Sequence, residues 1–216
     1  MEKLIFANFN GYVEKTTQEE PERVQVGPEH FQPLRDLQEI NGRMGGDIFY
    51  AFLNKIFDRQ EYEVIGILPQ YLLDLHAAKV FDARSYSKGI SKFLNVMPNI
   101  SADYPKLFEW FSLVLLTLYN CKAFSFKDVT WFEKRRDDDD PMVEDYYRIA
   151  AHFLKRYSEQ DSVQLSQITQ LYKDDFKKAL DDMRAMILED NLFKDIAASF
   201  ESGRKTETIV GLLEGK

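Results

Sequence analysis

The chain has 216 residues, of which 44% are hydrophobic, 14% aromatic and 30% charged. Its formal net charge of -8 disfavours nucleic acid or an anionic membrane as the main partner, because both require a basic surface. The single cysteine excludes an internal disulfide, and no apolar run approaches the ~20 residues that a membrane span requires. The start of the chain also lacks the long apolar core of a signal peptide, so we expect a folded protein of the cytoplasm or nucleus, with the cytoplasm preferred, that binds no membrane.

Residues 1–30 are predicted to form a tail or linker, because TTQEEPERVQVGPEH is polar and contains Pro21, Gly27 and Pro28. From about residue 31 the pattern becomes helical. The sequence NGRMGGD reads as a turn, after which Asp47 is predicted to cap a helix. The apolar stripe of that helix is typical of a buried face and consists of Ile48, Phe49, Phe52, Leu53, Ile56 and Phe57.

Three further helices are predicted between residues 64 and 118. The first carries Val64, Ile67, Leu68, Tyr71, Leu72 and Leu75, and Pro69 predicts either a kink or a later helix start. Asp82 is predicted to cap the second and Pro98 to end it, with a core face of Tyr86, Ile90, Phe93, Leu94 and Met97. The third, over residues 107–118, is apolar on two faces and is therefore expected to be buried on both sides.

Beyond the acidic run Asp137 to Asp140, helical spacing returns over about residues 143–157 and 174–200. Residues 201–216 read as a C-terminal tail. Because strand alternation is absent and connections are short, the sequence predicts an all-α fold. An irregular stack of antiparallel helical hairpins over residues 31–200 fits the pattern better than a symmetric bundle.

The sequence offers few groups for catalysis. His30, His76 and His152 lie far apart, none belongs to a metal-binding motif, and Cys121 has no histidine near it in sequence. The aromatic residues fall on the same apolar stripes as the aliphatic ones, which indicates core packing. We therefore expect no catalytic residue, metal or cofactor, and no enzyme. The alternative of a different class, a hydrolase or transferase on a helical scaffold, would require a nucleophile–base pair that the sequence does not display.

The segment SADYP, residues 101–105, precedes the most apolar predicted helix. One interpretation is local: Ser101 or Asp103 caps the helix, and Pro105 occupies the first turn, where its missing N–H has no consequence. The other is that the Asp103 carboxylate is displayed to a partner, and the two interpretations are compatible.

Residues 48–118 resemble the MI domain, a helical-hairpin (HEAT-like) domain of the translation initiation scaffold initiation factor 4 gamma and of the programmed-cell-death-4 repressor. The resemblance is carried by Tyr86 and Ile90 in one helix, by the Asp-x-Pro loop of Asp103 to Pro105, and by the bulky helix directly after it. Downstream, YYRIAAHFLKRYSEQDSVQLSQI and YKDDFKKAL are similar to the closing helices of that domain. The likeness covers about residues 45–200.

This resemblance implies a non-enzymatic adaptor that docks on the DEAD-box helicase initiation factor 4A. It points to Asp103 as the contacting carboxylate and to Pro105 as the residue that shapes the loop. Family members usually present a second acidic residue four positions earlier, and here that position is Asn99. Other initiation factors are further candidate partners, whereas direct RNA binding is not expected. The alternatives are a translational repressor that occupies the same helicase surface, or a helical interaction module for a different partner.

Overall fold

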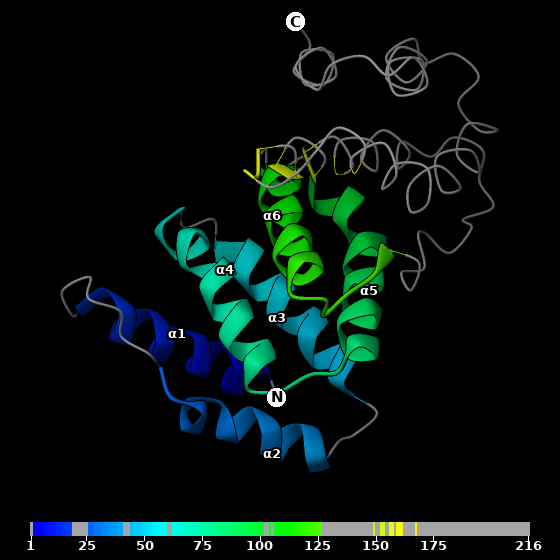
Figure 1. Ribbon diagram of the computed structural model, residues 1–216. Coiled ribbons are helices and arrows are strands. Elements are labelled where there is room, and N and C mark those ends of the chain that lie inside the picture. The colour runs from blue at the N-terminus through cyan, green and yellow to red at the C-terminus, as the bar shows by residue number, and fades with distance from the viewer. Residues whose placement is uncertain are drawn as a thin grey trace, which may run out of the picture. The chain divides into compact units, whose positions relative to one another are not determined.

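The computed structural model describes residues 2–18, 26–40, 44–59, 62–101, 104, 106–126 and single positions between 149 and 167. Within these ranges the secondary structure is entirely helical, which confirms the all-α prediction for them. The elements are α1 (Glu2–Gln18), the 3-10 helix η1 (Pro28–Phe31), α2 (Gln32–Ile40), α3 (Gly45–Arg59), α4 (Tyr62–Ala77), α5 (Ala83–Ser101) and α6 (Leu107–Asn120) (Figure 1).

The chain divides into two compact units. The first comprises Met1–Ile100 and Thr117–Glu133, and the second comprises Ser101–Leu116 and Lys134–Lys216. None of the helices in the described ranges combines the length and the apolar character that crossing a lipid bilayer requires.

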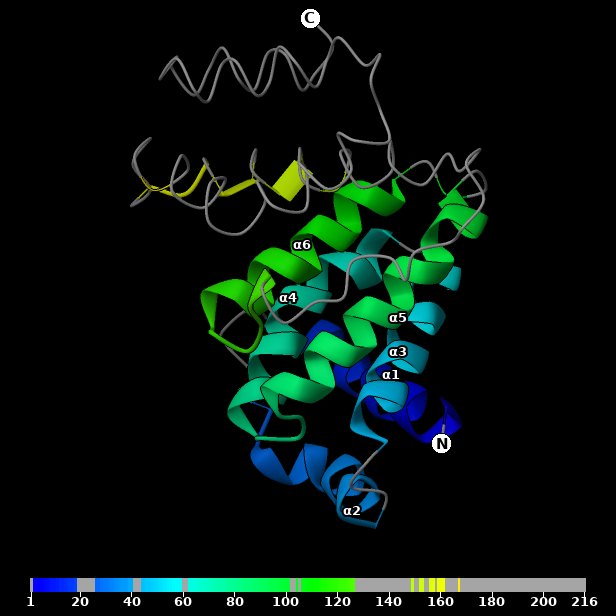
Figure 2. The same ribbon diagram turned by 90° about the vertical axis from the view of Figure 1, so that its right-hand side faces the viewer.

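The expectation of a tail over residues 1–30 is wrong for α1 and η1. Ile5, Phe9 and Tyr12 recur at helical spacing and are at most 2% exposed, and Phe31 of η1 is also buried. In the first unit α1 packs against η1, α2, α3 and α4, and α2 lies along one end of that unit in two perpendicular views (Figure 1, Figure 2). The prediction failed because the polar run that follows α1 outweighed its apolar face.

Aromatic side chains from α1, η1, α3 and α4 meet in the centre of the first unit. The ring centroid of Tyr71 lies 4.8 Å from that of Phe9, 5.0 Å from Tyr12, 5.4 Å from Phe52 and 5.7 Å from Phe31. Edge-to-face and tilted rings at these distances attract one another beyond the gain from burial alone. This cluster anchors α1 to the helices that follow it.

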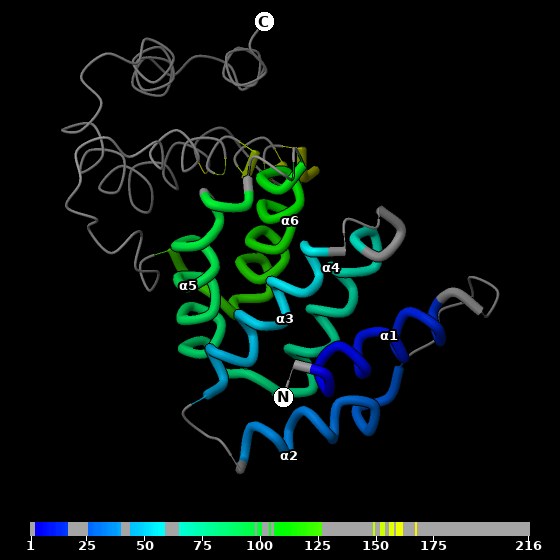
Figure 3. The backbone as a smooth tube through the Cα atoms, turned by 180° about the vertical axis from the view of Figure 1, so that it is seen from behind, coloured from blue at the N-terminus to red at the C-terminus, as the bar shows by residue number. Residues whose placement is uncertain are grey.

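Helix α3 lies between α1 and α5, as the view from behind shows (Figure 3). Its predicted stripe is confirmed: all six residues from Ile48 to Phe57 named for it are at most 2% exposed. The predicted core face of α5 is likewise buried, from Tyr86 to Met97. Glycines bring α3 and α5 close together, since a Cβ atom at Gly89 would lie 3.0 Å from the carbonyl oxygen of Gly46.

The predicted helix ends are confirmed at one position and corrected at three. Asp82 caps α5, because its Oδ1 accepts a 2.7 Å hydrogen bond from the Ser85 amide. Asp47 does not precede α3 as a cap but lies in its first turn. Helix α4 begins at Tyr62 and continues through Pro69, so the later start is wrong. Helix α5 continues through Pro98 to Ser101, because packing of the preceding buried turn outweighs the one hydrogen bond that a proline removes.

Helix α6 is buried along most of its length, as its two apolar faces predicted. In the second unit its first turns meet a later segment of the chain. The Ser112 hydroxyl lies 2.6 Å from the carbonyl oxygen of Phe108 and 3.1 Å from that of Ile149. Arg156 donates a 2.8 Å hydrogen bond to Glu109. Most of the predicted helices over 143–157 and 174–200, and the tail over 201–216, lie outside the described residues.

Candidate functional site

The predicted contact residue Asn99 lies in the last turn of α5 and is exposed. It belongs to the first unit, whereas Asp103 and Pro105 fall in the stretch assigned to the second. Asp103 and Pro105 lie outside the described residues. Next to them, the Tyr104 carbonyl oxygen accepts a 2.9 Å hydrogen bond from the Leu107 amide at the start of α6.

The outer face of α5 is polar and basic along its length. The helix ARSYSKGISKFLNVMPNIS contains Arg84, Lys88 and Lys92 and no acidic residue. These three residues follow one another at intervals of four, so they share one face at steps of about 6 Å along the helix axis. Asn95 and Asn99 continue this face toward the C-terminal end. We call Arg84, Lys88 and Lys92 the basic stripe.

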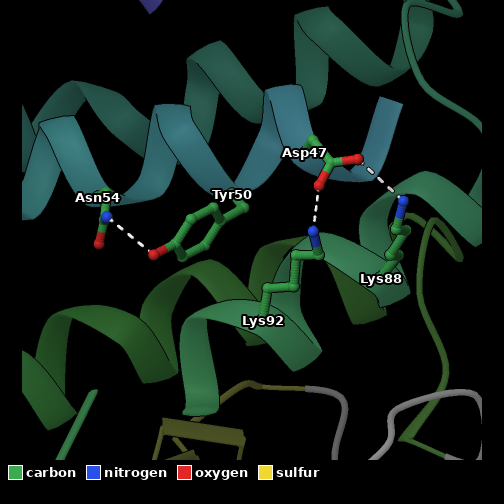
Figure 4. Close-up of polar contacts among 5 residues, drawn as sticks. All are labelled: Asp47, Tyr50, Asn54, Lys88 and Lys92. Carbon is green, nitrogen blue, oxygen red and sulfur yellow. Dashed lines mark hydrogen bonds and ion pairs between the residues drawn. The ribbon is translucent and has the colours of Figure 1, made fainter. Parts of the chain in front are cut away.

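Asp47 of α3 holds two members of the basic stripe. Its Oδ2 accepts a 2.9 Å hydrogen bond from Lys88, and its Oδ1 pairs with Lys92 (Figure 4). The side chains of Lys88 and Lys92 remain 44% and 43% exposed, and that of Asp47 is 33% exposed. The carboxylate therefore fixes both ammonium groups at the surface without removing them from solvent.

The electrostatics of this cluster favour the charged state of Asp47. Hydrogen bonds from Lys92 and then Lys88 hold the pKa of its carboxyl below the ordinary value of 3.8. On the same side of α3, Tyr50 accepts a 3.1 Å hydrogen bond from Asn54 (Figure 4). The edge where α3 meets α5 thus presents an aromatic ring, an amide, a carboxylate and two ammonium groups.

A second polar cluster is buried beneath α1. The Tyr71 hydroxyl donates a 2.9 Å hydrogen bond to Oδ1 of Asn8, and the Asn8 amide donates a 2.6 Å bond to the carbonyl oxygen of His30. His30 Nε2 lies 2.9 Å from the Asn8 carbonyl oxygen, and Tyr12 donates a 2.5 Å bond to Asp74. Burial lowers the pKa of His30. These bonds connect structural elements and pair no nucleophile with a base.

The surroundings of Cys121 do not form a reactive thiol. Its Sγ lies 3.4 Å from the Leu118 carbonyl oxygen, and burial raises the pKa of the thiol, which favours the neutral form. Tyr86 is fully buried, and among the described residues its hydroxyl has no hydrogen-bond partner. Burial raises the pKa of this hydroxyl, and the charges of Cys121 and Asp82 raise it further. In the part of the chain that the structure describes, His, Cys, Asp and Glu nowhere gather into a group of three that could hold a metal ion.

Sequence reasoning missed the basic stripe and its carboxylate. The signal for the stripe was present, because three basic residues at intervals of four in a helix without acidic residues stand out in a chain of net charge -8. The contact with Asp47 could not be predicted from a local pattern, because Asp47 precedes Lys88 by 41 positions and Lys92 by 45 positions. No family model matches the sequence, and neither the curated proteins nor the solved structures give a match.

Proposed function

We propose that this protein is a non-enzymatic adaptor in translation initiation that docks on a DEAD-box helicase of the initiation factor 4A type, in the manner of the initiation factor 4 gamma scaffold. The proposal rests on the likeness of residues 48–118 to the MI domain. The observation that carries it is the exposure of Asn99 at the end of α5. An exposed amide four residues before Asp103 is available to a partner, which supports the proposal.

Helix α1 supports the finer fold that the proposal requires, a stack of antiparallel helical hairpins. The sequence pattern predicts a tail over residues 1–30 and so places no helix before residue 31. In the first unit, α1 packs against α2 and η1 as well as against α3 and α4. These elements give the proposed stack an additional helical layer before α3.

The docking contact is proposed to be electrostatic. A carboxylate at Asp103 would accept charge-assisted hydrogen bonds from an arginine of the helicase, and Asn99 would offer a neutral acceptor. The Asp103→Ala variant is expected to lose about 1.5–3 kcal/mol of binding free energy, the usual range for a hydrogen bond to a charged group. Loss of a helix cap would instead lower stability by about 0.5–2 kcal/mol, but α6 begins at Leu107, four residues after Asp103, so this effect is not expected.

Titration calorimetry with purified helicase tests the proposal through Asn99→Asp. If Asn99 faces an arginine, the added charge should tighten binding about two- to tenfold at low salt, and the gain should shrink as salt rises. Asn120→Asp is the matched control, because Asn120 is an exposed asparagine at the end of α6 and its variant has the same net charge. Equal or weaker binding of Asn99→Asp at low salt would contradict the docking contact. So would an equal gain from Asn120→Asp.

A further inference from the structure

The basic stripe on α5 is unusual for the protein that carries it. The chain has 36 acidic and 28 basic residues, yet the charged residues of α5 are all basic. The opposite face of α5 is fully buried, so the stripe is the side that this helix presents outward. Arg84 is exposed, and Lys88 and Lys92 retain nearly half of their side-chain exposure.

The lysines of the stripe are held in place before any partner arrives. Asp47 pairs with both ammonium groups from the neighbouring helix (Figure 4). The stem of Lys88 also lies close over α3, because a Cβ atom at Gly46 would come within 2.6 Å of the Lys88 Cβ. Ordering long side chains at an interface costs about 0.5–1.5 kcal/mol each, and a prior restraint lowers that cost.

We propose that the basic stripe docks an acidic helical segment of a protein partner, with carboxylates at positions i, i+4 and i+8 facing Arg84, Lys88 and Lys92. Both helices then repeat their charges at the same axial step of about 6 Å, so three ion pairs can form in register. Asn95 and Asn99 extend the surface with neutral hydrogen-bonding groups. The ion pairs of this contact rest on Arg84, Lys88 and Lys92, none of which takes part in the proposed helicase docking; the two surfaces share only Asn99.

The charges of this surface favour an acidic helix over RNA. Asp47 neutralises part of the charge on Lys88 and Lys92 and repels phosphates and peptide carboxylates alike, so the number and spacing of the cations distinguish the two partners. Nucleic-acid affinity also draws on many phosphate contacts, and three partly neutralised cations supply few. A protein partner with a short row of carboxylates matches the small number of cations and their spacing.

Fluorescence anisotropy with the full chain tests this proposal. The probe is a labelled alanine-rich peptide with glutamates at i, i+4 and i+8, compared with a peptide of equal charge whose glutamates at i, i+5 and i+10 point in different directions. The first peptide should bind more tightly, and its affinity should fall with salt. The Lys88→Gln/Lys92→Gln variant should weaken that binding about three- to tenfold, as expected for two exposed ion pairs.

The control is Lys3→Gln/Lys15→Gln, which removes the same charge from exposed positions of α1 and should leave binding within about twofold. Arg84→Gln leaves the bonds to Asp47 intact and provides a second test if the double variant of α5 does not fold; it should weaken binding about two- to threefold. Equal affinity for both peptides, or equal loss in the α1 control, would overturn the proposal. So would tighter binding of a labelled oligouridine that the α5 variant abolishes.

Discussion

Replacing Gly89 with alanine tests the close approach of α3 and α5. A Cβ atom at this position would lie 2.8 Å from Cδ1 of Phe49 and 3.0 Å from the Gly46 carbonyl oxygen. The carbonyl belongs to the backbone of α3 and cannot rotate away. The Phe49 ring is fully buried, with its centroid 5.0 Å from that of Tyr86 and 5.8 Å from that of Phe81. Neither neighbour has room to move, so the helices must separate.

The size of the effect follows from two opposing contributions. Alanine in place of glycine inside a helix favours folding by about 1 kcal/mol, whereas an extra carbon in a filled core costs about 1–3 kcal/mol. Gly66 in α4 is the matched control, because nothing lies within 4 Å of a Cβ atom there. Gly66→Ala should therefore stabilise the protein. The unfolding free energy of Gly89→Ala should lie about 1–3 kcal/mol below that of Gly66→Ala.

Equilibrium unfolding in urea, followed by far-UV circular dichroism, measures both variants against the natural sequence. The comparison between the two alanines removes the shared helix-propensity gain and isolates the steric cost at the α3–α5 contact. Equal stabilisation by both substitutions would show that the helices have space at Gly89. That result would refute the packing described for Phe49 and Gly46.

Three further outcomes follow from the polar contacts. Tyr71→Phe should lower the unfolding free energy by about 1–3 kcal/mol, because it leaves the buried Asn8 oxygen without its donor; no change in urea unfolding would contradict this bond. The NMR titration of His30 should give a pKa below 6.5, so the unfolded chain binds more protons and stability should fall as pH drops below 6.5; a midpoint at or above 6.5 would contradict the burial of the ring. Asp47→Asn should cost about 0.4–2 kcal/mol at neutral pH and low salt, for two exposed ion pairs. Because the carboxyl pKa lies below 3.8, the difference from the natural sequence should persist down to that pH and vanish as Asp47 protonates; a difference independent of pH would argue against the ion pairs.

The helices from α3 to α6 were predictable because each carries its own regular apolar stripe. Periodicity of this kind predicts the buried face of a helix from residues that are close in sequence. The cap at Asp82 is local too, because Asp82 lies three residues before the amide that it binds. The stop assigned to Pro98 failed because a local rule for proline competes with the packing of a buried helix. Helix α1 was missed because its short stripe of Ile5, Phe9 and Tyr12 precedes a long polar run.

The candidate surfaces depend on contacts that no local pattern encodes. Asp47 reads as a cap from sequence, since aspartate before an apolar stripe usually is one, yet its partners come from α5. The sequence pattern indicates that the basic residues of α5 form a stripe. It does not indicate that this stripe lies beside α3. Of the predicted contact residues, the structure places Asn99 at the surface, and the contact roles of Asn99, Asp103 and Pro105 remain predictions.

The polar cluster beneath α1 has a consequence for the order of folding. The hydrogen bonds from Tyr12 to Asp74 and from Tyr71 to Asn8 join residues 62 and 63 positions apart. Closing such a loop carries an entropic cost that grows with its length, whereas the partners of α3, α4 and α5 are nearer along the chain. During synthesis α1 can meet η1, α2 and α3 as soon as they follow it, but its hydrogen bonds to Asp74 and Tyr71 can form only after α4 has been made. Until then Phe9 and Tyr12 lack their native ring contacts with Tyr71, so this part of α1 is open to chaperones and proteases during synthesis.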